Sequence, residues 1–288
     1  MYKERILKMT EQKIEIGRNF LDLDKIIENK SKTLHNMLPG FVLSYLKRIV
    51  HQEEMNEFIY ENRNKFGVDF ARAIIEGFDI SINVINEGNI PKTGRYIMAS
   101  NHPLGGFDGI AFITIAGKFR KDIVFPVNDL LMNLPNLNEL FIPINKHGSN
   151  AENVKIINDT FASDNLILYF PAGLVSRKIK GEIVDLPWKK TFITKARNFK
   201  RDIIPVYMDG RISNKFYRIA NSRKKMGVKA NIEMLYLVDE QYRQQNKNLP
   251  IVIGDTIPYT TFDRTHNDAY WAEWVKEKVY ELRNQIKK

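Results

Sequence analysis

The stretch RYIMASNHPLGGFDGIAFITIAGKF, residues 95–119, decides the fold. Its first six residues, 95–100, predict a strand, whereas GIAFITIAGKF, residues 109–119, predicts a helix. The segment NHPLGGFDG between them carries His102 and Asp108 in a glycine-containing turn. Open α/β folds collect ligands and catalytic groups where a strand passes into a helix. The pair is therefore a candidate for catalysis.

The same turn also has a purely structural interpretation. Gly105 and Gly106 allow backbone angles that are closed to other residues, so they can serve simply to make a tight turn. Asp108 then caps the following helix, and His102 is an incidental loop residue. The stretch by itself does not choose between a catalytic pair and a glycine-rich bend.

The pattern of the chain changes near residue 80. Residues 1–79 read as helices, including the segments 38–63 and 67–78, and no strand is evident there. The strand candidates that follow are residues 79–86, 95–100, 122–127, 140–144, 165–170, 202–208, 231–238 and 250–254. The helix candidates that alternate with them are residues 108–119, 151–163, 188–199, 214–226 and the C-terminal 267–288. We expect a helical N-terminal region, 1–79, packed on an α/β domain, 80–288, in which helices flank a mixed central sheet.

Composition limits the classes of partner and of chemistry. The 288 residues carry 44 Lys and Arg against 34 Asp and Glu, a formal charge of +10, which favours an anionic partner such as a phospholipid surface, a nucleic acid or a phosphorylated carrier. The absence of cysteine excludes disulfides and a cysteine nucleophile, and it fits a reducing cytoplasm. The five histidines show no His-x-x-x-His spacing, so we expect no metal site.

We expect neither a signal peptide nor a membrane-spanning helix. The first 17 residues carry Glu4, Glu11 and Glu15 and lack a continuous apolar core. No stretch approaches the roughly 20 apolar residues that a spanning helix needs. The expectation is a cytoplasmic protein that associates peripherally with the inner face of the cell membrane.

Four blocks, in order, resemble those of the glycerolipid acyltransferase superfamily, which includes the lysophosphatidate acyltransferases. That family has a His-x-x-x-x-Asp block, a second block ending in a basic residue, a Phe-Pro-Glu-Gly block and a block with proline between hydrophobic residues. The corresponding stretches here are NHPLGGFDG, LFIPINKHG with Lys146, FPAGLVSRK from Phe170, and IIPVYM with Pro205. The resemblance covers roughly residues 80–260, and the helical start resembles N-terminal helices that some members use for membrane docking.

The sequence departs from that pattern in two blocks. Five residues, rather than four, separate His102 from Asp108. One extra residue in a regular helix would rotate a side chain by about 100°, so the glycine turn has to absorb it for the pair to meet. In the third block, the family's Glu, Thr and Arg positions hold Ala172, Leu174 and Val175, which puts the family's acceptor contacts in question but not its chemistry.

The residue types suit acyl transfer from a thioester to an alcohol. The alcohol must lose its proton as it attacks, and histidine titrates near neutrality, which makes His102 the candidate base. Asp108 is the carboxylate that fixes the tautomer and stabilises the imidazolium. Amides of the Gly105–Gly106 turn or of the helix start are candidates for stabilising the oxyanion. The chain lacks a Gly-x-Ser-x-Gly nucleophile elbow, so no acyl-enzyme is required.

The resemblance implies the acceptor and the donor. The acceptor-binding candidates are Lys146, Gly173, Ser176, Arg177 and Lys178. The donor is a thioester of acyl carrier protein (acyl-ACP) or of coenzyme A (acyl-CoA), and no cofactor is bound. With its apolar third block and the NHPLGGFDG form of its first block, the sequence resembles a bacterial branch that O-acylates monoacylated amino-acid lipids such as glycine or ornithine lipids. Lysophosphatidate is the alternative acceptor.

Two other functions stay open at this point. A nucleic-acid-binding protein would explain the charge, but no recognised module pattern is present, and we expect no nucleic acid partner. A catalytically silent lipid-binding relative would explain the departures from the family pattern, although both His102 and Asp108 are present.

Two further segments each have two interpretations. Trp188, with Lys189 and Lys190, either lies at a lipid interface or opens an amphipathic helix. The segment LPGFVLSYLKRIV, residues 38–50, is helix–helix core by default, and a membrane-facing apolar surface is the alternative.

Overall fold

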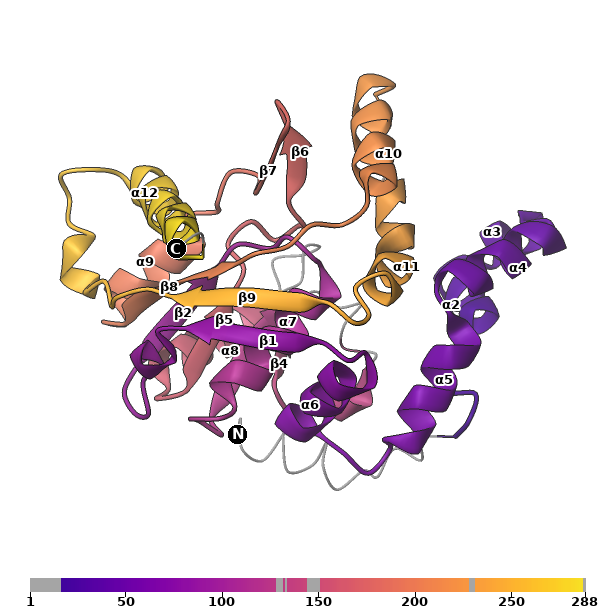
Figure 1. The fold of residues 1–288 in the computed structure, drawn as a ribbon, viewed down its shortest axis with the longest axis horizontal. Helices are drawn as coiled ribbons and strands as arrows, with labels where there is room; N and C mark the ends of the chain where they lie inside the picture. The colour runs from indigo at the N-terminus through magenta and orange to yellow at the C-terminus, as the bar shows by residue number, and fades with distance from the viewer. Residues whose placement is uncertain (1–16, 128–131, 133, 144–150, 228–230, 287–288) are drawn as a thin grey trace.

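A seven-stranded sheet forms the centre of the protein (Figure 1). The computed structural model describes residues 17–127, 132, 134–143, 151–227 and 231–286. The strands, in sheet order, are β1 (Ser81–Ile85), β9 (Asn248–Ile253), β8 (Asp202–Met208), β2 (Tyr96–Ser100), β5 (Leu166–Tyr169), β3 (Ile123–Val127) and β4 (Phe141–Pro143). Neighbouring strands are parallel except β8 and β9, which are antiparallel. The expected mixed α/β sheet is confirmed.

Strand β2 lies in the middle of this sheet. Ala99 pairs with Pro205 of β8 on one side and with Tyr169 of β5 on the other. Because all three strands are parallel, their carboxyl ends meet at one edge of the sheet. This edge therefore gathers the first and third sequence blocks, which follow β2 and β5, beside the strand that contains Pro205.

Helices cover both faces of the sheet. They are α6 (Gly67–Gly77), α7 (Gly106–Ala116), α8 (Ala151–Ala162), α9 (Thr191–Asn198), α10 (Asn214–Lys225), α11 (Leu237–Tyr242) and α12 (Asp268–Glu281). Met98 faces a core that it shares with α6 and α7, whereas its neighbour Ile97 faces a second core shared with α8, α9 and α12. This alternation is the pattern of a strand buried on both faces. Because α6 shares a core with α7, the expected packing of the N-terminal region on the α/β domain holds for this helix, and the boundary near residue 80 stays a prediction.

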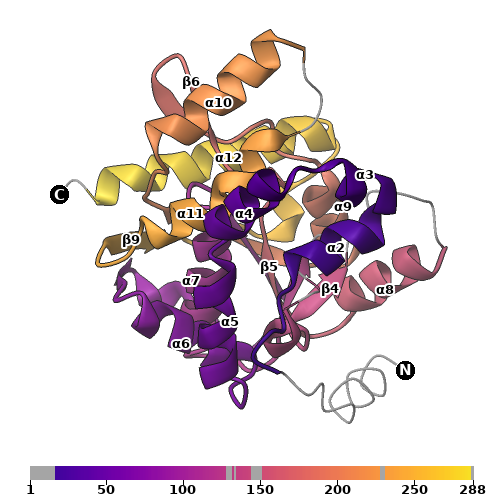
Figure 2. The same cartoon turned by 90° about the vertical axis from the view of Figure 1, so that its right-hand side faces the viewer.

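The N-terminal helices lie along one side of the α/β layers (Figure 2). They are α2 (Leu23–Lys30), α3 (Lys32–Met37), α4 (Gly40–Ile49) and α5 (Gln52–Glu61). The chain breaks between α4 and α5, where the sequence predicted one continuous segment, because His51 has a left-handed φ of 49°. The His51 ring stacks on Tyr242, and its Nε2 lies 3.3 Å from Asp239 Oδ1. Among the described residues, none of the helices combines the length and the apolar character needed to cross a membrane.

The predicted strand at residues 231–238 is wrong. This segment forms the 3-10 helix η4 (Ile232–Tyr236) and then enters α11. Met234 and Leu237 both pack against the core, and their three-residue spacing places them on one face of a helix rather than of a strand. The apolar composition of the run was correct evidence for burial but not for strand pairing.

A hairpin that the sequence analysis missed follows the third block. Strands β6 (Arg177–Ile179) and β7 (Glu182–Val184) pair antiparallel. Lys180 and Gly181, between them, have φ of 49° and 90°, as a tight two-residue hairpin turn requires. The hairpin projects beside α10 (Figure 1), and Asn221 Nδ2 donates to the backbone oxygen of Lys178 at 3.3 Å.

Candidate active site

The candidate catalytic turn joins the end of β2 to the start of α7. Asn101, the first residue after β2, is 2% exposed, and it exchanges two hydrogen bonds with the backbone of Met208, of 2.9 Å from Nδ2 and 2.7 Å to Oδ1. These bonds tie the turn to the end of β8. Gly105 then takes a φ of 79°, which residues with a side chain rarely adopt, and α7 begins at Gly106. No sequence pattern indicates this role of Asn101.

His102 and Asp108 meet in this turn. Nδ1 of His102 lies 2.9 Å from Oδ2 of Asp108. The same oxygen accepts the backbone N–H groups of Leu104 at 2.7 Å and of Gly105 at 2.9 Å. The turn has therefore absorbed the extra residue between the histidine and the aspartate. Asp108 caps the start of α7 and also has the geometry that a catalytic pair requires.

The environment of Asp108 sets the tautomer of His102. Asp108 is fully buried, and this burial raises the pKa of Asp108, while hydrogen bonds from His102 and from the two amides oppose the rise. Three donors on one oxygen favour the ionised carboxylate. An ionised carboxylate can only accept hydrogen bonds, so Nδ1–H of His102 is the donor and Nε2 carries the lone pair.

The ring of His102 lies against Phe170, the first residue of the third block. The ring centroids are 4.2 Å apart, and the planes are inclined by 17°. This stacking contact restricts rotation of the imidazole ring, which the hydrogen bond from Nδ1 to Asp108 holds at its other end. The His102 side chain is 16% exposed, so part of it stays accessible to solvent. An alcohol that reaches Nε2 can transfer its proton there.

The start of α7 offers N–H groups to an oxyanion. The N–H of Gly105 is already bound by Asp108. The first N–H groups of a helix have no acceptor within the helix, so those of Gly106 and Phe107 are the remaining candidates. A Cβ on Gly106 would lie 2.1 Å from Nε2 of Gln241, so α11 packs directly on this part of the turn.

The predicted acceptor-binding residues lie in different surroundings. Lys146 lies outside the described residues. Ser176 is 1% exposed, its backbone N–H donates to the oxygen of His102 at 2.8 Å, and its hydroxyl donates to Asp185 at 2.5 Å. The Ser176 side chain is thus engaged within the protein, next to the catalytic turn. Its role in acceptor binding stays a prediction.

Arg177 and Lys178 are the first two residues of β6, and they contact elements next to the hairpin. Arg177 is 7% exposed, and its Nη2 donates to Glu233 Oε1 at 2.9 Å. Glu233 also pairs with Arg223 at 2.8 Å, so one buried carboxylate joins β6, η4 and α10. Burial lowers the pKa of Arg177, and the charge of Glu233 opposes this effect. Lys178 is half-buried on β6.

The cation beside Gly173 in the third block is Lys189, which is not one of the predicted acceptor-binding residues. Gly173 has a φ of 65°, and Nζ of the exposed Lys189 lies 3.1 Å from the position that a Cβ on Gly173 would occupy. The neighbouring Trp188 is 4% exposed, so it does not lie at a lipid interface, and α9 begins only at Thr191. Among the described residues, no three His, Asp or Glu side chains gather to hold a metal.

Asp185 is a further buried group at this site, and it belongs to none of the four sequence blocks. It is 2% exposed, and its Oδ1 accepts the backbone N–H of His102 at 3.2 Å. Asp185 lies 83 positions from His102 along the chain, so no local pattern could have indicated the contact.

The chain is similar to proteins of known activity over most of its length. A family profile described as acyltransferase matches residues 25–288. The lyso-glycine lipid O-acyltransferase of Phocaeicola vulgatus is 45% identical over 282 residues, which cover 97% of this chain and 100% of that protein. A protein of the same name from Bacteroides thetaiotaomicron is 46% identical over 264 residues, 91% of this chain and 97% of that protein. The crystal structure of the 1-acyl-sn-glycerophosphate acyltransferase of Thermotoga maritima aligns over 98% of both chains, with 17% identity and a TM-score of 0.46.

Proposed function

The chain belongs to the acyltransferase family, and from this premise we propose that it moves a fatty acyl group from a thioester to the hydroxyl of a lysolipid. The observation that carries the proposal is the His102–Asp108 pair, in which Nδ1 is held by a buried carboxylate. Within the described part of the chain, Nε2 makes no hydrogen bond, which leaves it for the acceptor hydroxyl.

The reaction follows from this arrangement. Nε2 of His102 takes the hydroxyl proton while the hydroxyl oxygen attacks the thioester carbonyl. The carbonyl oxygen becomes an oxyanion, to which the N–H groups of Gly106 and Phe107 donate. The tetrahedral intermediate then expels the sulfur, which takes the proton back from His102, and the products are an ester and a free thiol. Asp108 stabilises the imidazolium between the two proton transfers.

The acceptor we propose is a monoacylated amino-acid lipid, with lyso-glycine lipid as the first candidate. The two relatives named above act, by their names, on lyso-glycine lipid. Ala172 and Val175 of the third block are 4% and 1% exposed, and neither has a side-chain donor for a glycerol phosphate. The ammonium group of Lys189 beside Gly173 suits a carboxylate head group.

A side-by-side assay of the purified protein tests this proposal. Lyso-glycine lipid and lysophosphatidate are compared as acceptors, each with acyl-ACP and with acyl-CoA, and release of the free thiol is measured. We expect faster release with lyso-glycine lipid than with lysophosphatidate. Efficient acylation of lysophosphatidate alone would contradict the acceptor. Lipid binding without thiol release from either donor would contradict the enzymatic proposal and favour a silent lipid-binding protein.

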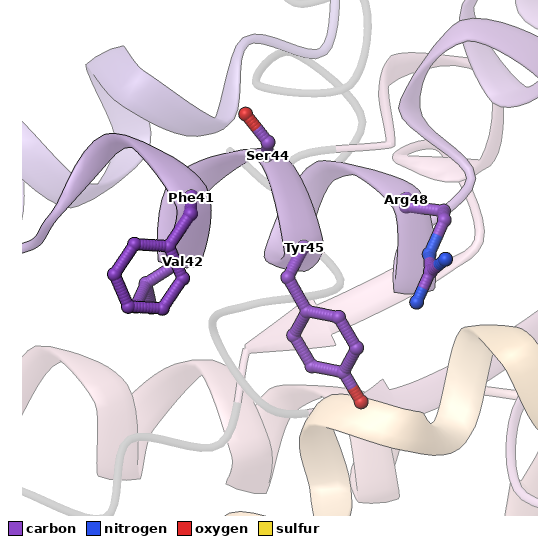
Figure 3. Close-up of a pocket in the computed structure, with 5 residues that line it drawn as sticks. All are labelled: Phe41, Val42, Ser44, Tyr45 and Arg48. Carbon is purple, nitrogen blue, oxygen red and sulfur yellow. The ribbon is translucent and has the colours of Figure 1, made fainter.

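We further propose that the protein works in the cytoplasm, bound peripherally to the inner face of the cell membrane. Phe41 on α4 is 77% exposed, and Met37, just before this helix, is 74% exposed. A cavity of about 530 Å³ is lined by Phe41, Val42, Ser44, Tyr45 and Arg48 (Figure 3). Figure 3 shows Phe41 and Tyr45 on one side of α4 and Ser44 on the other. An exposed apolar side of a helix and a formal charge of +10 together suit an anionic lipid surface.

Substitution of Phe41 tests the membrane proposal. Phe41→Ser is expected to weaken binding to vesicles with anionic lipid by about tenfold, because it removes a large apolar side chain from the contact. Flotation of vesicles measures the bound fraction, and binding should weaken as salt is added. Tyr270→Ser is the matched control, because Tyr270 is 46% exposed on α12, away from α4 (Figure 1). Equal loss in both variants, or no preference for anionic over neutral vesicles, would contradict the proposal.

A further inference from the structure

Asp185 carries a buried negative charge next to the candidate catalytic histidine. Its Oδ1 accepts the backbone N–H of His102 at 3.2 Å and the Ser176 hydroxyl at 2.5 Å. Its Oδ2 accepts the indole N–H of Trp188 at 2.9 Å. All three donors are neutral groups, and Asp185 forms no salt bridge within the described residues. The carboxylate therefore satisfies its hydrogen bonds while its charge is left uncompensated by them.

The backbone N–H and the backbone oxygen of His102 are both hydrogen-bonded to residues that flank the β6–β7 hairpin. Ser176, just before β6, donates its backbone N–H to the oxygen of His102 at 2.8 Å. Asp185, just after β7, accepts the N–H of His102. The backbone N–H of Asp185 in turn donates to the hydroxyl oxygen of Tyr280 on α12 at 2.8 Å. The hairpin therefore fixes the backbone from which the imidazole projects, and α12 fixes the hairpin.

We propose that Asp185 is a positioning residue for the acyl transfer, which orients His102 through its backbone and stabilises the imidazolium through its charge. The proposal rests on the proposed role of His102 as the general base. Asp185 acts at a distance from the reacting atoms, whereas Asp108 touches the ring. Charges inside a protein are screened less than charges in water, so a carboxylate bonded to the histidine backbone acts on the ring.

Asp108 and three tyrosines are the other titratable groups around His102 and Asp185. From α7, Asp108 binds Nδ1 directly. From α12 and β8 come Tyr280 and Tyr207, and burial raises the pKa of each far above its usual value, so both stay neutral. Tyr217 lies on α10. Burial raises the pKa of Tyr217 to about 12, and the charge of Asp108 makes a smaller contribution in the same direction.

Two cations near the turn, Arg177 and Lys189, do not pair with Asp185. Arg177, next to Ser176, is directed at Glu233. Lys189 extends over Gly173 and is exposed to solvent, which screens it. The two carboxylates Asp108 and Asp185 are therefore the buried charges that His102 contacts, one through its ring and one through its backbone.

The test replaces Asp185 with its neutral isostere. Asp185→Asn is expected to lower kcat by about 10- to 100-fold, with little change in KM for the acceptor. Loss of a residue that orients a metal-bound histidine has an effect of this size. Removing the negative charge makes protonation of His102 less favourable. The acid limb of the profile of kcat/KM against pH should therefore move to lower pH. A purely structural role would lower the rate without moving the limb.

A measurement without substrate separates this inference from the proposed function. The imidazole proton signals of His102, assigned by their loss in His102→Ala, are titrated by NMR in the wild type and in Asp185→Asn. The midpoint should fall in the variant, in the same direction as the acid limb. This shift would support the inference even if the assay above found no acyl transfer, so the two can fail separately.

Trp188→Phe is the matched control, because it removes the indole donor to Asp185 and keeps the charge. It is expected to lower the midpoint of thermal unfolding and to leave the His102 titration in place. If Asp185→Asn does not fold, Asp185→Ser carries the same expectation for the His102 titration, since it also removes the negative charge. An unchanged NMR midpoint in a folded neutral variant, or an equal shift in Trp188→Phe, would overturn the inference.

Discussion

His102→Ala is expected to lower kcat/KM for acyl transfer by about 10²- to 10⁴-fold and to leave the protein folded. The loss follows because the acceptor hydroxyl would have to give its proton to water while it attacks the thioester. The fold should survive because the imidazole lies in a turn, is 16% exposed, and packs mainly on Phe170. Thiol release measures the rate, and circular dichroism with thermal unfolding checks the fold.

The control for this variant is His266→Ala. His266 is exposed and stacks on Tyr270 with a centroid distance of 3.8 Å, in the segment before α12. Its removal changes the number of histidines without touching the turn, so turnover should match that of the wild type. Wild-type turnover in a folded His102→Ala protein would remove His102 from the mechanism.

The geometry of the candidate catalytic turn could be predicted from the sequence because its determinants are local. The apolar run that ends at Ser100 and the helical run from Gly109 fix a strand and a helix on either side of eight residues, 101–108. Gly105 and Gly106 within those eight residues allow the turn to close with an unusual His/Asp spacing. The contact between His102 and Asp108 spans six positions and depends on little beyond this segment.

The rest of the site depends on contacts across the chain. Asn101 binds Met208 and Asp185 binds His102, and each pair is separated by more than 80 positions. Glu233 lies in an apolar run and reads as a surface residue of a strand, yet it is fully buried beside Arg177. The sequence pattern indicates whether a segment is buried and with what period its apolar residues repeat. It does not indicate which distant residue pairs with a buried charge.

The misassigned segment 231–238 shows why this matters for the site. Leu237 lies 3.2 Å from the position that a Cβ on Gly105 would occupy, and Gln241 packs on Gly106. The same short helix contacts the N-terminal helices through Asp239, whose carboxylate lies 3.3 Å from His51. A strand at this position would have belonged to the sheet, whereas the helix packs on the catalytic turn.

Asp108→Asn is expected to lower kcat/KM by about 10²- to 10⁴-fold, because it removes the charge that stabilises the imidazolium. The structure makes this a clean substitution. Oδ2 of Asp108 accepts all three hydrogen bonds, whereas Oδ1 is buried and makes none within the described residues. An asparagine can therefore place its oxygen at Oδ2 and keep the same three donors, with its amide nitrogen at Oδ1.

That amide nitrogen would be a buried donor without a partner, which costs about 1–3 kcal/mol of stability. Asp108→Ala gives the comparison, because it removes both the charge and the acceptor for His102, Leu104 and Gly105. We expect the alanine variant to lose activity at least as severely and to unfold at a lower temperature than the asparagine variant. If a folded Asp108→Asn protein turned over at the wild-type rate, the hydrogen bond to Nδ1 would suffice and the carboxylate charge would have no part in catalysis.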